Sequence, residues 1–132
     1  MGVVSVYLLD TCVFYWICSK PAKLPPPIAR LLRNEPDQLH VSHVSALEIV
    51  NLWLAGKMQD PTKPRQWFRE QIANWNVSII RIDEEDIFRA SELPVHHRDP
   101  FDRLLIAQAI IRNMTLITPD TTIHRYPVST LW

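Results

Sequence analysis

Residues 3–10 read VVSVYLLD, a run of mainly β-branched and apolar residues that ends at a carboxylate. A strand that is apolar along its whole length is typical of parallel sheets, in which helices cover both faces. Similar segments follow at 40–44, 77–82 and 115–118, and a last extended piece is expected at 126–131. The sequence therefore predicts a mainly parallel sheet of four to five strands.

Helix signals lie between these strands. The pattern Ser45-x-x-Glu48 is typical of a capping box at a helix N-terminus. Strands that alternate with helices favour a three-layer α/β/α fold, and we expect residues 1–132 to form a single domain. Helices are expected from about residue 14, over 28–34, 45–57, 65–75 and 99–111, and from Asp83 onward, with a proline-rich connector at 20–27 and a break at 60–64.

The composition excludes several classes of protein. The chain has 14 Lys and Arg against 14 Asp and Glu, without the basic excess of a protein that coats nucleic acid. Its only glycines are Gly2 and Gly56, so it has no glycine-rich loop for a nucleotide phosphate. No apolar run approaches the roughly 18 residues of a membrane span, and we expect no signal peptide. Because Cys12 and Cys18 are its only cysteines, we expect a cytoplasmic protein without structural disulfides.

Carboxylates stand at corresponding points of the predicted sheet. Asp10 and Asp120 each follow a strand. Glu48 comes just after the second strand, and Asp102 lies in the first turn of the helix that leads to the fourth. The carboxyl ends of parallel strands and the N-termini of the connecting helices face one crevice, so these acids are expected to converge. Clustered carboxylates need cations to offset their repulsion, and oxygen ligands favour magnesium or manganese, which can activate water for phosphodiester cleavage.

Each acid except Asp10 also has a local explanation. Glu48 could serve only the capping box, and Asp102 could complement a helix dipole. Asp99 and Asp120 could each cap a helix. Asp10 closes a buried strand and has no cap to form, so it is the hardest acid to explain structurally. The joint placement of the acids therefore carries the prediction.

The histidines and arginines carry less information. The five histidines lack the spacing of a zinc site. His96 and His97 could touch a phosphate, but we interpret them as solvated loop residues. Arg65, Arg69 and Arg103 are candidates for contacts with a phosphate backbone, although a solvated position is the default for each.

Four sequence blocks, in order, resemble those of PIN-domain proteins: LLDT at 8–11, VSALEI at 44–49, HRDPFDRLLIAQA at 97–109 and LITPD at 116–120. The third block is highly specific, and the resemblance extends from residue 8 to about residue 126. It implies a PIN fold and a ribonuclease that depends on Mg²⁺ or Mn²⁺. Small single-domain members of this kind are typically VapC-like toxins, which an antitoxin protein neutralises and which often form homodimers.

The positions of these blocks imply a set of site residues. Cys12 departs from the pattern, since many relatives carry His or another polar residue there. By the resemblance, Asp10, Glu48, Asp102 and Asp120 are the catalytic and metal-binding acids, Asp99 is an additional metal ligand, and Thr11, Thr118 and Arg103 are expected to contact RNA or support the ligands.

A non-catalytic function of the same fold is the alternative. The helix that follows residue 45 is rich in apolar side chains, and Leu52, Trp53 and Leu54 could present a groove to an antitoxin or another subunit. The PIN-like chain would then act through protein association alone. A phosphatase-type enzyme also places an aspartate after its first strand, but its Asp-x-Asp pattern is absent because Cys12 stands at the second position.

Overall fold

The computed structural model describes residues 5–58 and 62–132. Within these residues the chain forms a five-stranded sheet in which every strand pair is parallel, with the order β3-β2-β1-β4-β5. This confirms the mainly parallel sheet of the prediction. The strands are β1 (Tyr7–Leu9), β2 (Leu39–Ser42), β3 (Ser78–Ile80), β4 (Thr115–Ile117) and β5 (Thr130–Leu131).

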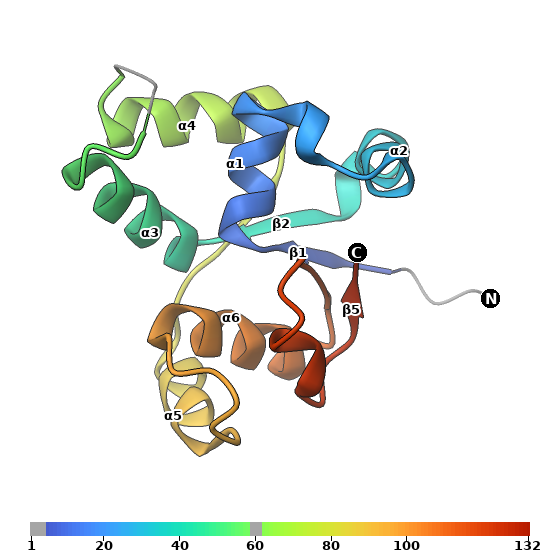
Figure 1. The fold of residues 1–132 in the computed structure, drawn as a ribbon, viewed down its shortest axis with the longest axis vertical. Coiled ribbons are helices and arrows are strands. Elements are labelled where there is room, and N and C mark those ends of the chain that lie inside the picture. Colours follow the sequence, from blue (N-terminus) through green and yellow to red (C-terminus); the bar gives the residue numbers. More distant parts are fainter. Residues whose placement is uncertain (1–4, 59–61) are drawn as a thin grey trace.

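Helices cover both faces of the sheet, which gives the three layers that the sequence predicts (Figure 1). One core unites the first four helices with one face, and a second core unites the last two with the other. None of the helices in the described residues is long and apolar enough to cross a membrane. The helices are α1 (Thr11–Ser19), α2 (Pro26–Asn34), α3 (His43–Leu54), α4 (Pro64–Trp75), α5 (Glu84–Glu92) and α6 (Pro100–Ile111).

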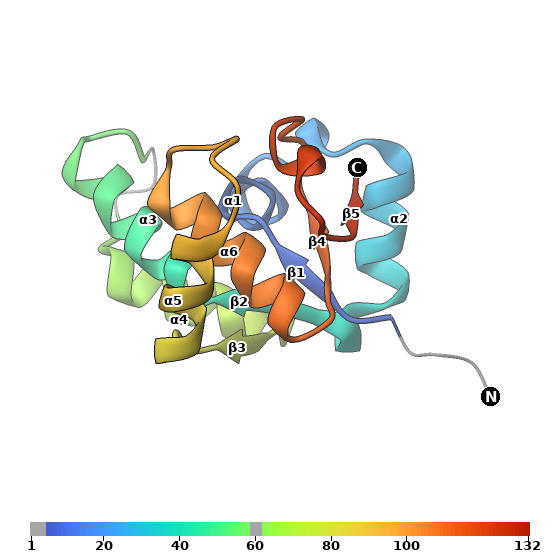
Figure 2. The same ribbon diagram turned by 90° about the horizontal axis from the view of Figure 1, so that it is seen from below.

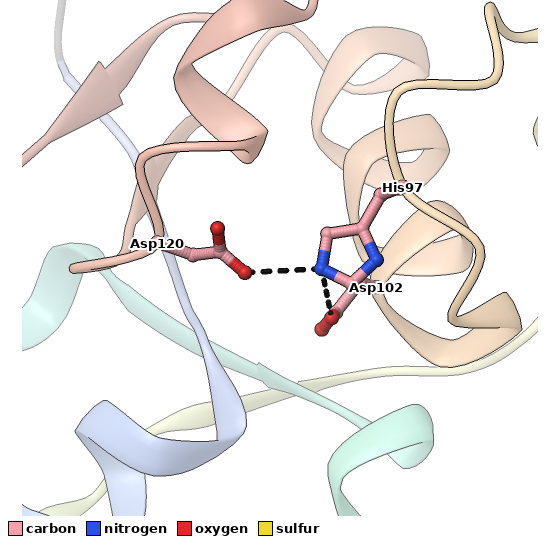
Figure 3. A group of neighbouring side chains, drawn as sticks. All are labelled: His97, Asp102 and Asp120. Carbon is pink, nitrogen blue, oxygen red and sulfur yellow. Dashed lines mark hydrogen bonds and ion pairs between the residues drawn. The ribbon is translucent and has the colours of Figure 1, made fainter.

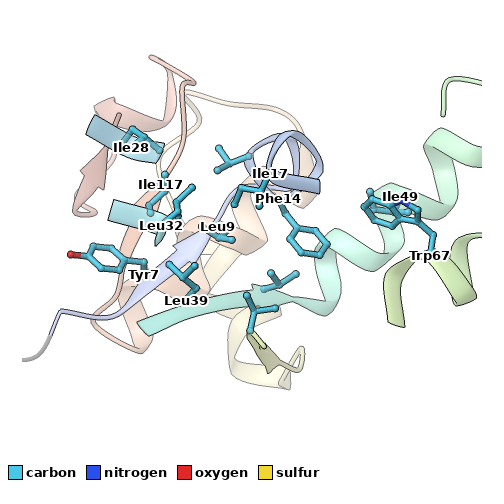
Figure 4. Close-up of a cluster of buried hydrophobic side chains, with 13 residues drawn as sticks. Tyr7, Leu9, Phe14, Ile17, Ile28, Leu32, Leu39, Ile49, Trp67 and Ile117 are labelled. Atoms are coloured by element: carbon cyan, nitrogen blue, oxygen red, sulfur yellow. The ribbon is translucent and has the colours of Figure 1, made fainter. Parts of the chain in front are cut away.

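The alternation of side chains along β1 divides the apolar residues between the two cores. Leu9 belongs to the first core and Leu8 to the second, because successive side chains of a strand point to opposite faces. In the first core the ring of Phe14 on α1 packs edge-on against Trp67 on α4, with their centroids 5.8 Å apart (Figure 4). This contact packs α4 against α1.

A buried ion pair joins α5 to α6, which lie side by side in Figures 1 and 2. Asp86 is only 1% exposed, and Arg112 donates hydrogen bonds of 2.8 and 3.0 Å to its two carboxylate oxygens. Gln108 donates a third, of 3.1 Å. Burial alone would raise the pKa of Asp86, but these hydrogen bonds outweigh it and lower the pKa below its ordinary value.

Several predicted boundaries are wrong. The strand expected at 40–44 ends at Ser42, and α3 begins at His43 because the Ser42 side chain accepts the backbone N–H of Val44. Ser45 is therefore inside the helix and does not cap it. The strand expected at 77–82 is limited to 78–80, and extended pairing near the C-terminus to 130–131. Residues 3 and 4 of the predicted first strand, and residues 60 and 61 of the predicted break, lie outside the described residues.

Candidate metal centre

The centre is built around the adjacent strands β1 and β4. Asp10 follows β1, and its backbone N–H donates to Ile117 at the end of β4. Thr118 continues β4 and donates a 2.6 Å hydrogen bond to Asp10 Oδ2, while its Oγ1 accepts the backbone N–H of Asp120. One buried hydroxyl thus connects two of the predicted acids across the carboxyl edge of the sheet.

Glu48 reaches the same place from the second turn of α3. Thr11 Oγ1 donates a 2.6 Å hydrogen bond to Glu48 Oε1 and lies 2.8 Å from Ser45 Oγ. Because Thr11 has a single hydroxyl proton, which goes to the carboxylate, Ser45 must be the donor in the second contact. Ser45 and Glu48, which the sequence paired as a capping box, therefore act together through Thr11 to connect α3 to α1.

The N-terminus of α6 contributes two more acids. Asp99 accepts a 2.9 Å hydrogen bond from the backbone N–H of Phe101, so its predicted role as an N-cap is correct. Asp102 lies in the first turn, and Glu48, Asp99 and Asp102 each offer a ligand atom within 4.8 Å of the others. An N-cap uses one carboxylate oxygen for this hydrogen bond, which leaves the other Asp99 oxygen for a cation.

These side chains open into a pocket of about 570 Å³. Asp10, Glu48, Asp102 and Asp120 all line it, together with Lys57, Tyr15 and Trp16. Cys12 lines it as well, and burial together with the neighbouring carboxylates raises the pKa of its thiol, which is thus neutral at neutral pH. The pocket therefore combines a group of acids with an aromatic side and one lysine.

Burial raises the pKa of the central acids. It raises the pKa of Glu48 to about 7 and that of Asp102 to about 7, and the charges of Asp10 and Asp99 add to the effect in both cases. Burial also raises the pKa of Asp10, although the hydrogen bond from Thr118 opposes it. Acids whose charges are disfavoured in this way gain most from a bound cation.

His97 joins the cluster, contrary to its interpretation as a solvated loop residue. Its Nε2 lies 2.9 Å from Asp102 Oδ2 and 3.0 Å from Asp120 Oδ2 (Figure 3). Burial would raise the pKa of Asp120, but hydrogen bonds from the backbone of Thr122 and from His97 lower it below its ordinary value. The sequence signals for His97 were its place at the start of the block at 97–109 and its position two residues before Asp99, and neither distinguishes a site residue from a loop residue.

Arg103 has a different position from the one its charge suggested. Its guanidinium donates hydrogen bonds to the backbone carbonyls of Ala90, Leu93, Pro94 and His97 at 2.7 to 3.3 Å. A guanidinium used in this way has few donors left for a phosphate. The contacts instead tie the loop that carries His97 to α5 and α6.

The cluster contains two adjacent ligand sets that share Asp102. One consists of Glu48, Asp99 and Asp102, and the other consists of His97, Asp102 and Asp120. The first set offers carboxylate oxygens alone, which suit a hard divalent cation. The second contains an imidazole, and its chemistry therefore depends on which ring nitrogen carries the proton.

Comparisons with known proteins agree with this fold. The family model of the PIN domain matches residues 7–128. The chain is 30% identical to Ribonuclease VapC22 of Mycobacterium tuberculosis over 128 residues, which cover 93% of this chain and 95% of the relative. A similar solved structure is VapBC2 of Rickettsia felis bound to a promoter DNA fragment, with a TM-score of 0.73 and 18% identity over 96% of this chain and 97% of that chain. Another is DNA-bound VapBC of Salmonella typhimurium, with a TM-score of 0.72 and 15% identity over 97% of this chain and 98% of that chain. A third, a toxin–antitoxin complex from Klebsiella pneumoniae, has a TM-score of 0.63 at 19% identity and covers 96% of both chains.

Proposed function

Because this chain belongs to the PIN-domain family, we propose that it is a ribonuclease that depends on a divalent metal ion. The observation that carries the proposal is the convergence of carboxylates from separate parts of the chain around one pocket. We extend it to residues 1–132 as a single PIN domain. The proposed metal ligands are Asp10, Glu48, Asp99, Asp102 and Asp120, and the proposed ion is Mg²⁺ or Mn²⁺.

The residues of the chain have separate tasks in this reaction. A divalent cation held by these acids would supply an acidified water and would offset the charge on the phosphate and the leaving oxygen. Thr118 and Thr11 hold the carboxylates of Asp10 and Glu48 in position through hydrogen bonds of 2.6 Å each. Asp102 belongs to both ligand sets, so its loss would affect the whole centre.

Cleavage of labelled RNA by the purified chain tests this proposal. We expect single-stranded or structured RNAs to be cut in Mn²⁺ or Mg²⁺ but not in EDTA, and we expect the Asp102→Asn variant to lose the activity. Asp37→Asn, at an exposed aspartate that does not line the pocket, is the matched control and should cut like the wild type. An Asp102→Asn variant that cleaves as fast as the wild type would contradict the assignment.

The named relative and similar structures support a protein partner as well. The relative is a VapC ribonuclease, and the structures are VapBC or toxin–antitoxin complexes. We propose that this chain is likewise the toxin of such a pair, acts in the cytoplasm and is held by a small antitoxin. We propose a homodimer too, for which α5 offers Ile87 and Phe88, each about half exposed.

A groove between α3 and α4 suits a segment of the antitoxin. Its volume is about 840 Å³, and Trp53 of the predicted partner surface lines it. Leu54 is 69% exposed and does not line it, whereas Leu52 packs against the first core and lines the acidic pocket. The groove therefore contains one of the three predicted residues. Its lining includes apolar Val50, Phe68 and Ile72 together with Lys63, Arg65 and Arg69, and so fits an apolar segment with acidic flanks.

Affinity for the proposed antitoxin, to be sought among the products of neighbouring genes, tests that assignment. We expect Trp53→Ala to weaken binding at least about 10-fold, because aromatic side chains in grooves carry a large share of binding energy. Leu54→Ala, one residue away and outside the groove, is the matched control and should bind like the wild type. Equal affinity of both variants would place the partner elsewhere.

The alternative is a PIN-like binding module without catalysis. This alternative would be preferred if the folded chain bound its antitoxin but cut no RNA in any metal. Titration of Mn²⁺ into the chain would then show whether the acids still bind a cation.

A further inference from the structure

Both ring nitrogens of His97 are engaged, and together they determine its protonation. Nδ1 lies 3.2 Å from the backbone N–H of Asp99 and accepts its hydrogen bond. An accepting nitrogen carries a lone pair, so the proton of a neutral ring must be on Nε2. Nε2–H then donates to Asp102 and Asp120 at 2.9 and 3.0 Å (Figure 3).

This tautomer prevents His97 from being a metal ligand in its present position. A ligand nitrogen needs a free lone pair, and on Nε2 that would require the proton to move to Nδ1. Nδ1–H would then face the N–H of Asp99, and a hydrogen bond would be replaced by two opposed donors. His97 therefore places a donor, with its partial positive charge, where a cation between Asp102 and Asp120 would otherwise bind.

The loop that carries the imidazole is held from several sides. Tyr126, which is 4% exposed, accepts hydrogen bonds from the backbone N–H groups of His96 and His97 at 3.0 and 2.7 Å. Arg103 donates to the His97 carbonyl and to three further carbonyls of the same region. These contacts fix the backbone from which the ring projects, and rotation of the ring away from the acids would break the contacts of both its nitrogens.

We propose that the N–H of His97 replaces a second cation between Asp102 and Asp120, so that the RNA-free protein binds a single divalent ion at Glu48, Asp99 and Asp102, next to the charge of Asp10. Of the five proposed ligands, Asp120 is then left to His97 while no RNA is bound. This inference rests on the proposed function, because it concerns the cations of the same site. Asp102 belongs to both ligand sets, and its Oδ2 lies 2.9 Å from the imidazole. Removal of the ring opens the Asp102–Asp120 side to a second ion.

Mn²⁺ titration of the RNA-free full chain, by calorimetry and by electron paramagnetic resonance of unbound Mn²⁺, tests this inference. We expect about one ion per wild-type chain and about two per His97→Ala chain. His96→Ala, at the exposed neighbour whose ring stacks edge-on against Tyr126, is the matched control and should bind one ion. His97→Gln keeps a side-chain N–H donor and should also bind one ion. If His97→Ala does not fold, the ion counts of His97→Gln and His96→Ala are compared with that of the wild type instead.

Three outcomes would overturn the inference. They are two ions per wild-type chain, a His97→Ala chain that binds one ion or none, and a His97→Gln chain that binds two. Weaker Mn²⁺ binding by His97→Ala would overturn it as well, because it would mean that the imidazole is itself a ligand. RNA cleavage by the wild type and by Asp102→Asn is measured separately. If His97→Ala bound a second ion but the wild type cut no RNA, the proposed ribonuclease function would be refuted and the inference about His97 would stand.

Discussion

Thr118 donates a 2.6 Å hydrogen bond to Asp10 across 108 positions of sequence, and both side chains are buried. The two residues are neighbours because β1 and β4 pair in parallel and their carboxyl ends meet at one edge. A hydroxyl that donates to a carboxylate stabilises its charged form and fixes the direction of its oxygens. The bond therefore prepares Asp10 for a cation.

Removal of this hydroxyl should weaken the metal centre. We expect Thr118→Val, which keeps the side-chain shape, to lower Mn²⁺ affinity and RNA cleavage by about 10-fold, the usual size for a residue that supports a metal ligand. Thr118→Ser keeps the hydroxyl and should recover most of both. Calorimetry and initial cleavage rates measure the effect, and a valine variant equal to the wild type would refute the role of the hydroxyl.

The acids should make the metal-free protein less stable at higher pH. The pKa of Glu48 is raised from 4.5 to about 7, so the folded protein keeps a proton that the unfolded chain loses. The stabilisation of the fold that comes from this bound proton is complete below about pH 4.5 and is lost as the pH rises through about 7. In EDTA we therefore expect a higher melting temperature at pH 6 than at pH 8, and Mn²⁺ should reduce the difference.

Variants assign this pH dependence to the site. Glu48→Gln should reduce the fall in melting temperature between pH 6 and pH 8. Glu92→Gln, at an exposed position at the end of α5, should leave this fall as in the wild type. Melting temperatures from circular dichroism in EDTA measure both. If the metal-free wild type were more stable at pH 8 than at pH 6, the acids would not have the raised pKa values that their burial predicts.

Loss of Arg112 should destabilise the fold without touching the site. Arg112→Met leaves Asp86 buried without its ion-pair partner, which typically costs about 3 kcal/mol of unfolding free energy. Arg81→Met, at an exposed arginine near the same helix pair, should change stability by less than about 0.5 kcal/mol. Urea denaturation measures both free energies, and equal values would show that the buried pair contributes nothing.

Arg103 should matter for stability rather than for contact with RNA. A lysine at this position cannot reproduce the hydrogen bonds to Ala90, Leu93 and Pro94, so we expect Arg103→Lys to cost roughly 2 kcal/mol. RNA affinity, measured by fluorescence anisotropy in an Asp102→Asn background, should change less than about 2-fold because the positive charge is kept. If Arg103→Lys left stability unchanged and weakened RNA binding, the hypothesis that Arg103 contacts an RNA phosphate would be preferred.

Local patterns predicted much of the fold because they report burial directly. The apolar run that ends at Asp10 identified a two-sided strand, and the acids after successive strands had to meet once the sheet was parallel. The capping box failed for a specific reason. Ser42 and Ser45 both precede apolar helical residues, and only the contact of Ser45 with Thr11, 34 positions away, shows which serine is left for the cap.

The sequence by itself determined the α/β fold, the order of its layers and the acids at the carboxyl edge, since periodicity and strand ends are local properties of the chain. Tertiary structure alone decided how the side chains around those acids are used. His97 turned inward to Asp102 and Asp120, and Arg103 turned to backbone carbonyls instead of a phosphate. Both choices depend on hydrogen-bond partners that are distant in sequence, which no local pattern encodes.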